Sequence, residues 1–265
     1  MREMHAMSIN VDDHRRGARL AIALLATRLA LVALVTVATW WLTKGGSGFP
    51  PNPMLATLSL IPVNLASLVL VRRMLRAEGH SARGLIGLRR GRLFNDIGWG
   101  LLWVAALFAP FMIAVLGTVW LMHGDQTFVA FETLFYEPDE TPILSPVGAL
   151  ITGVVAFVTF APLNAPVEEL VFRGYAQSRL SLAWSPGLAI ACSSVVFGMQ
   201  HAFFAPTRAA MLVYVVAFTV WGIGSGIIVH RQRRLAPIII AHFLVNLMAS
   251  LPAVVFPILR VTGAV

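Results

Sequence analysis

Two adjacent glutamates, Glu168 and Glu169, are the only acidic residues after Glu140 in a chain that continues to residue 265. They stand at the end of a long apolar stretch, where an ionised side chain is costly and is retained for a reason. Carboxylates in such a place can serve as a general base or as metal ligands. These two residues are therefore the first candidates for chemistry.

Histidines show a similar selectivity. Of the seven in the chain, only His201 and His242 fall inside apolar stretches. Phe197 precedes His201 by four positions, and Asn246 follows His242 by four. Residues four apart share one face of a helix, so each histidine is expected to have its partner beside it.

Arg173 follows Glu169 at the same four-residue spacing, in an order that favours pairing on a helix. Taken alone, this pattern also fits a structural ion pair at a helix end, with Glu168 turned to headgroups or water. Pro162 and Pro166 precede the pair, and we expect them to kink the helix. Polar groups supplied by three separate helices favour a site over the structural interpretation.

Composition indicates where these helices lie. The chain is 58% hydrophobic and 12% charged, with a mean hydropathy of +0.79, which is far from the averages of soluble domains. Apolar stretches long enough to cross about 30 Å of hydrocarbon need about 20 helical residues. Seven such stretches occur, at about 20–43, 54–71, 97–122, 146–172, 188–207, 209–229 and 235–257.

The predicted fold class is therefore all-α, a polytopic membrane helix bundle with about seven transmembrane helices. No repeat or soluble segment interrupts the pattern, so we expect a single membrane-embedded domain over residues 1–265, with its catalytic core at 146–250. The first apolar stretch is too long for a signal-peptide core, and we expect an uncleaved anchor.

Arginine placement predicts the orientation. Seven arginines lie between residues 72 and 92, and three between 231 and 234, whereas the segment 123–145 has five acids and no Lys or Arg. Positively charged loops stay cytoplasmic, so the amino terminus is expected inside and the carboxyl terminus outside. The net charge of +8 then reflects loop arginines next to anionic lipid headgroups, and no nucleic-acid partner is expected.

Helix geometry tests whether the polar groups can meet. At a rise of 1.5 Å per residue, Glu168 lies about 16 Å and His242 about 10 Å from the cytoplasmic boundary. His201 reaches a similar depth of about 16 Å only if the connection 178–187 lies along the membrane interface. We adopt that arrangement as a hypothesis.

Two further features lie inside apolar stretches. Arg28 is expected to point into the bundle or to pair with a loop acid, with no partner identifiable. The segment GIGSG at 222–226 has small residues at helical spacing, which is typical of close helix packing.

Three motifs in order carry a family resemblance. EELVFR at 168–173 fits EExxxR, FGMQH at 197–201 fits FxxxH, and HFLVN at 242–246 fits HxxxN. Together they resemble the CAAX prenyl protease and bacteriocin-processing family of intramembrane endopeptidases, also called the Abi family. The resemblance covers about residues 146–250 and leaves the first three spans supported only by the general architecture.

The resemblance implies roles for the motif residues. Glu168 would be the general base that activates water, with His201 sharing in that activation. His242 and Asn246 would stabilise the oxyanion of the tetrahedral intermediate. Glu169 and Arg173 would orient and charge-balance the site.

The implied enzyme is an endopeptidase of the glutamic type, without a cofactor. The same side chains also make a plausible zinc set of two histidines with one or two carboxylates, although the sequence contains no HExxH motif. Metal-dependent hydrolysis therefore stays open beside metal-free catalysis.

The expected partners are membrane lipid and a membrane-associated peptide or protein substrate. The expected location is the inner (plasma) membrane of a bacterium, because loops are short and arginine greatly outnumbers lysine. Two rival functions remain. One is a non-catalytic membrane scaffold or bacteriocin self-immunity protein, and the other is a small transporter with a Glu and His proton relay, which the absence of internal repeats disfavours.

Overall fold

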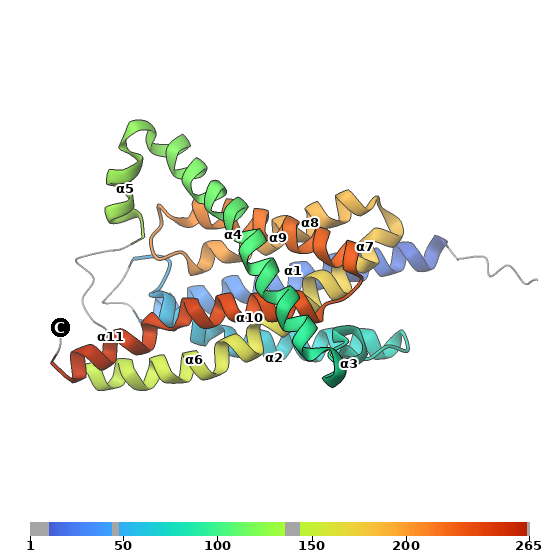
Figure 1. Ribbon diagram of the computed structural model, residues 1–265, viewed down its shortest axis with the longest axis horizontal. Coiled ribbons are helices and arrows are strands. Elements are labelled where there is room, and N and C mark those ends of the chain that lie inside the picture. The colour runs from blue at the N-terminus through green and yellow to red at the C-terminus, as the bar shows by residue number, and fades with distance from the viewer. Residues whose placement is uncertain (1–10, 44–47, 136–143, 264–265) are drawn as a thin grey trace, which may run out of the picture.

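The computed structural model describes residues 11–43, 48–135 and 144–263, and over these ranges the chain is helical, without a strand. The expected amino-terminal tail up to residue 10 and three acids of the acidic segment, Glu137, Asp139 and Glu140, lie outside the described residues. The elements, most of them labelled in Figure 1, are α1 (Val11–Leu42), α2 (Pro53–Ala77), α3 (Ala82–Ile86), η1 (Arg90–Arg92), α4 (Leu93–His123), η2 (Gly124–Gln126), α5 (Thr127–Leu134), α6 (Pro146–Glu169), η3 (Leu170–Gln177), α7 (Ser178–Ala183), α8 (Pro186–His201), η4 (Ala202–Phe204), α9 (Met211–Gln232), α10 (Ala236–Ser250) and α11 (Pro252–Val261).

The predicted fold class is confirmed. Within the described residues, seven helical segments are long and apolar enough to cross a membrane. The third and fourth exceed the sequence prediction by the most: the third reaches from Ala82 to Leu134 and the fourth from Pro146 to Ala183. The protein is a multi-pass helical membrane protein.

The long helices pack side by side in a closed order. Helix α1 contacts α2, α2 contacts α6, α6 contacts α10, and α10 contacts α4. Helix α4 then contacts α9, α9 contacts α8, and α8 returns to α1. Figure 1 shows α4 crossing this assembly at a steep angle, while α6 runs alongside α10 and α11. Every long helix therefore has neighbours on two sides, and its outer face is left for lipid.

The short element η3 fills the middle of the bundle. It contacts α1, α2, α8 and α9 in addition to its chain neighbours α6 and α7. All eight of its residues are buried, and Phe172 and Tyr175 are fully so. Apolar burial on every side thus anchors the turn that follows the paired glutamates.

The prolines lie inside α6 without ending it, and the kink predicted at them stays a prediction. The α-helix runs unbroken through Pro162 and Pro166 to Glu169, and a π-helical turn begins only at Leu170. Neighbouring helices can satisfy the backbone groups that prolines free within a membrane bundle. The irregular backbone therefore follows the glutamates directly in the chain. Short π-helical segments within α-helices frequently occur at functional sites.

The segment 178–187 is helical for most of its length, and its predicted position along the membrane interface stays a prediction. Residues Ser178 to Ala183 form α7 and continue the preceding helix. The next helix begins at a strong start signal, because Ser185 caps it by accepting the Leu188 N–H and Pro186 occupies its first turn. Only Trp184 and Ser185 separate α7 from α8.

The glycines of GIGSG pack as the sequence indicated. An added Cβ at Gly222 would lie 2.9 Å from a Ser194 carbon, and one at Gly226 would lie 2.9 Å from Ile190. Both contacts are with α8, so glycine lets α8 and α9 approach closely.

Candidate functional site

Glu168 lies in the last turn of α6, and its side chain is 2% exposed. Its Oε1 accepts a hydrogen bond from Arg28 Nη2 at 2.7 Å and another from Gln200 Nε2 at 2.8 Å. Its Oε2 is buried and has no hydrogen-bond partner in the described part of the chain. The two oxygens of one carboxylate thus differ: one is fixed and the other is free to accept.

Glu169 forms the predicted local pair. Its Oε1 accepts from Arg173 Nη1 at 3.3 Å, which confirms the pairing expected from the four-residue spacing. The same oxygen lies 2.9 Å from His242 Nδ1, and Arg173 Nη2 also donates to the Gly222 carbonyl at 3.5 Å. Helix α10 is therefore joined to the end of α6 through Glu169.

His242 lies between the two glutamates. A carboxylate only accepts, so the Nδ1 that faces Glu169 carries the hydrogen. The other ring nitrogen, Nε2, faces Glu168 Oε2 at 3.6 Å, which is longer than a hydrogen bond. One imidazole therefore connects the two carboxylates, with a hydrogen bond to one and an open contact to the other.

His201 is held by the last turn of its own helix. Its Nδ1 lies 2.7 Å from the Phe197 carbonyl oxygen, which can only accept, so Nδ1 carries the hydrogen and Nε2 is left available. The ring stacks on Phe218 with centroids 3.7 Å apart and an interplanar angle of 9°. The spacing of FxxxH has a physical basis here, because the carbonyl and the ring of Phe197 both contact the histidine.

Asn246 lies one turn beyond His242 on α10 and is 8% exposed. Its amide nitrogen Nδ2 is buried and donates to no group among the described residues. An unpaired buried donor costs about 1–3 kcal/mol, so it is kept for something that binds there. This donor is available to a water molecule or to a substrate oxygen.

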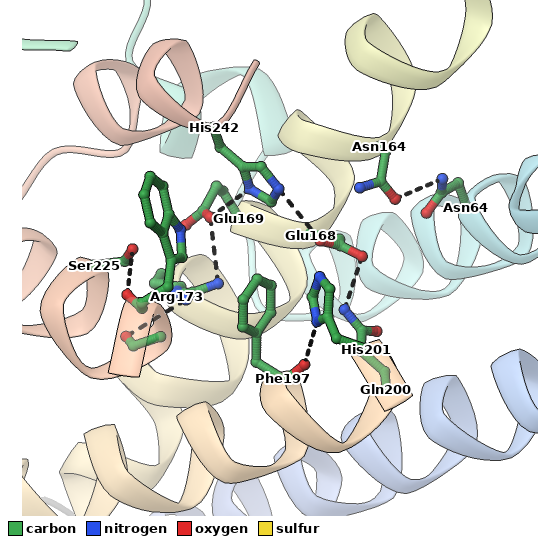
Figure 2. Close-up of polar contacts among 12 residues, drawn as sticks. Asn64, Asn164, Glu168, Glu169, Arg173, Phe197, Gln200, His201, Ser225 and His242 are labelled. Atoms are coloured by element: carbon green, nitrogen blue, oxygen red, sulfur yellow. Dashed lines mark hydrogen bonds and ion pairs between the residues drawn. The ribbon is translucent and has the colours of Figure 1, made fainter. Parts of the chain in front are cut away.

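Figure 2 shows how the predicted residues lie relative to one another. Glu168, Glu169, Arg173, His201 and His242 face a common centre, from α6, η3, α8 and α10. The Phe197 ring lies near both imidazoles, with ring centroids 4.6 Å from His201 and 6.0 Å from His242. His201 therefore reaches the same site as Glu168 and His242.

Arg28 is the residue that the motifs missed. It is 1% exposed and pairs with Glu168, an intramembrane acid rather than a loop acid. It also donates to Gln200, Ser67 and Asn64. The available signal was its position, because a charged residue inside an apolar stretch needs a partner in the bundle.

The buried charges of the site cancel. The two carboxylates of Glu168 and Glu169 are offset by the two guanidinium groups of Arg28 and Arg173. The Arg173 guanidinium also lies 4.2 Å from the centre of the Phe197 ring, a favourable cation–π position. In a protein interior each of these attractions is much stronger than in water.

A zinc site would draw on the two glutamates and the two histidines. Among the residues that the structure describes, no group of three His, Cys, Asp or Glu side chains is arranged to hold a metal ion. His242 Nδ1 is already committed to Glu169, and His201 Nδ1 to a backbone carbonyl. Their Nε2 atoms are the nitrogens that remain for a ligand or a water molecule.

Comparison with known proteins agrees with the motifs. Residues 147–248 match the family model described as Rce1-like, type II CAAX prenyl endopeptidase Rce1-like. The match runs from α6 to α10 and confirms the family resemblance over the segment in which the motifs predicted it. No curated protein and no solved structure shows significant similarity to the chain. The family match supports a function of the CAAX intramembrane protease kind.

Proposed function

We propose that the protein is an intramembrane endopeptidase that hydrolyses a peptide bond in a membrane-associated peptide or protein. Water activated by Glu168, with help from His201, is the nucleophile. The observation that carries the proposal is the buried Glu168 carboxylate with one oxygen held by two donors and the other left open beside an imidazole. A structural ion pair has no need of the open oxygen.

Glu168 is suited to act as the general base. Arg28 and Gln200 fix Oε1, so Oε2 is presented in a defined direction for a water proton. His201 contributes a second acceptor, because its Nε2 carries no hydrogen in the tautomer that the Phe197 carbonyl selects. General-base catalysis of this type contributes about 10²–10⁴-fold.

Asn246 is the group best placed to stabilise the oxyanion. Its unpaired Nδ2 can donate to the oxygen on which negative charge develops, at no cost in hydrogen bonds already formed. His242 differs, because its Nδ1 hydrogen is engaged by Glu169. It donates to the oxyanion only when Nε2 is protonated, and Glu168 Oε2 at 3.6 Å is the group that can supply that proton.

The resulting steps balance. The water oxygen attacks the carbonyl carbon of the scissile peptide bond, and the water gives a proton to Glu168. The substrate carbonyl becomes a tetrahedral intermediate with a negatively charged oxygen. Collapse of that intermediate breaks the C–N bond, and the proton passes from Glu168, directly or through His242 Nε2, to the leaving nitrogen. Glu169 and Arg173 keep His242 in place throughout.

The substrate and the setting follow from the site. The scissile bond has to reach carboxylates that are buried within helices able to span a membrane, so the substrate is membrane-associated. We place the protein in a bacterial inner membrane with its amino terminus in the cytoplasm, on the basis of the arginine distribution. A reporter enzyme active only in the cytoplasm, fused to the amino terminus, tests this orientation and contradicts it if it is silent.

The test is cleavage of a labelled peptide library by the purified full-length protein in detergent. We expect wild-type protein to cleave and Glu168→Gln to lose about 10²–10⁴-fold in rate, because the amide cannot take up the water proton. Glu132→Gln is the matched control, since Glu132 is exposed on α5. His201→Ala tests the second acceptor, and a chelator arm tests for a bound metal.

Other outcomes point to the rival functions. Absence of cleavage by folded wild-type protein, with the in vivo phenotype intact in Glu168→Gln, indicates a scaffold or self-immunity protein. Substrate flux into vesicles that is lost in Glu168→Gln indicates a transporter. Loss of cleavage with chelator, restored by zinc, replaces metal-free catalysis with the metal-dependent form.

A further inference from the structure

The argument begins with an arginine in the middle of the first helix. Arg28 lies within a candidate membrane span, Asp13–Leu42, and is among the largest fully buried side chains. Insertion of an arginine at the centre of a membrane helix costs about 2.5–3.5 kcal/mol on insertion scales. Residues 147–248 match the family model, so Arg28 lies far outside the matched segment.

Its contacts hold the guanidinium in one orientation. Nε donates to Gln200 Oε1 at 3.0 Å, and Nη1 donates to Ser67 Oγ at 3.0 Å. Nη2 donates both to Asn64 Oδ1 at 3.0 Å and to Glu168 Oε1 at 2.7 Å. Only the planar fork of arginine serves four such acceptors at once, whereas lysine offers a point charge.

Gln200 is the second hydrogen-bond donor to the Glu168 carboxylate. It accepts from Arg28 through its Oε1 and donates to Glu168 Oε1 through its Nε2 at 2.8 Å. Both donors therefore reach the same carboxylate oxygen, and Oε2 is left facing His242. Because Gln200 immediately precedes His201, this contact also fixes α8 beside the base.

A second link holds α2 to the same helix. Asn64, which orients Arg28, donates through Nδ2 to Asn164 Oδ1 at 3.0 Å. Asn164 lies four residues before Glu168 and therefore on the same face of α6. Helices α1 and α2 together thus hold α6 through two buried contacts, one turn apart.

We propose that Arg28 is a positioning residue for hydrolysis: it holds Glu168 in its charged form with Oε2 directed at the reacting water, supported by Gln200 and Asn64. This inference rests on the proposed function and extends it to helices that carry none of the three motifs. The competing interpretation is an ion pair that only joins helices, and it predicts a loss of stability without a change in how activity depends on pH.

The pH dependence depends on every charged or titratable group around the carboxylate. Glu168 is faced by Arg28 from α1, by His201 from α8 and by His242 from α10, with Glu169 and Arg173 next along its own segment. Among these, Arg28 makes the shortest contact with it. Loss of the guanidinium disfavours the charged carboxylate, so the acid limb of the activity profile has to move to higher pH.

The experiment measures kcat, KM and the pH profile of the full-length protein in detergent, on a peptide that wild-type protein cleaves. Arg28→Met is the main variant. Arg19→Met is its matched control, because Arg19 lies exposed on the same helix. We expect Arg28→Met to lose about 10²–10³-fold in kcat with little change in KM, as for other preorganised charges. Its acid limb should move to higher pH.

Two further variants keep the test decisive if Arg28→Met does not fold. Arg28→Lys retains the charge without the fork, so its acid limb should stay near that of wild type while its kcat falls. Gln200→Met removes the second donor and should lower kcat with a smaller shift in the acid limb. Thermal unfolding of each variant in detergent separates these effects from loss of folded protein.

The outcomes distinguish this inference from the proposed function. A pH profile and kcat like those of wild type in folded Arg28→Met overturn the role of Arg28, while cleavage by wild type and its loss in Glu168→Gln still stand. A fall in kcat that only tracks the fraction of folded protein makes Arg28 structural. Absence of cleavage by folded wild-type protein removes the proposed function and this inference with it.

Discussion

The two adjacent glutamates are neutralised in different ways. Glu169 pairs with Arg173 on its own helical segment at 3.3 Å, four residues away. Glu168 pairs with Arg28 at 2.7 Å, 140 residues away in the sequence and on another helix. The first pair belongs to the segment 147–248 that matches the protease family model, and the second reaches outside it to α1.

This difference separates two tasks. The segment from α6 to α10 supplies the groups proposed to contact water and substrate. Helices α1 and α2 supply the cation and the amide that hold one of those groups in place. Because α1 and α2 carry no motif, sequence comparison detects the first task and not the second.

After Glu168→Gln, the largest expected effect within the motif-bearing segment comes from Asn246→Ala. Its Nδ2 has no hydrogen bond to lose within the ranges that the structure describes, so stability should be nearly unchanged while kcat falls by about 10²–10³-fold. Kinetics and thermal unfolding of the same preparation measure both. Asn95→Ala, at an exposed position on α4, is the control. Unchanged kcat would remove Asn246 from the reaction.

The opposite balance is expected in the motif-free helices. Asn64→Ala removes one of the four acceptors of the Arg28 guanidinium and the donor to Asn164 Oδ1. Each such loss costs about 1–3 kcal/mol, so unfolding in denaturant should show a clear loss of stability. The fall in kcat should be smaller than for Asn246→Ala. A stable variant with activity as low as that of Asn246→Ala would contradict the division of tasks.

The smallest expected effect concerns how α8 is positioned. An added Cβ at Gly198 would lie 2.0 Å from Thr219 Oγ1 and 2.5 Å from the Val215 carbonyl oxygen, so Gly198→Ala has to push α9 away. Overpacking of this kind costs about 1–3 kcal/mol. Gly187→Ala on the same helix has open space and should match wild type. Equal unfolding midpoints for both variants would show that α8 and α9 are not tightly packed here.

Local patterns in the sequence predicted what depends on local geometry. Hydrophobic length gave the seven spans, and the four-residue spacings gave the Glu169 to Arg173 pair and the Phe197 to His201 contact. The π-helical turn after Glu169 was not predicted. Prolines show where a helix can be disturbed, but they do not show at which residue the disturbance occurs.

The partner of Arg28 was not predictable from spacing. Its contacts with Glu168 and Gln200 form because α1 packs against α8 and η3. No local sequence pattern encodes this packing between distant helices. Asn64 and Gln200 did carry a weak signal, as polar residues in apolar stretches. A search for such residues without an assigned partner is the route by which sequence reasoning finds supporting residues of this kind.

The central claim is that Arg28 serves catalysis through Glu168, and a kinetic double-mutant cycle tests it most directly. The measurement compares kcat/KM of Arg28→Met, Glu168→Gln and the double variant with that of wild type. We predict that the double variant is no worse than Glu168→Gln alone, within about threefold, because Arg28 has no role once the carboxylate is gone. Losses that multiply in the double variant would contradict the account.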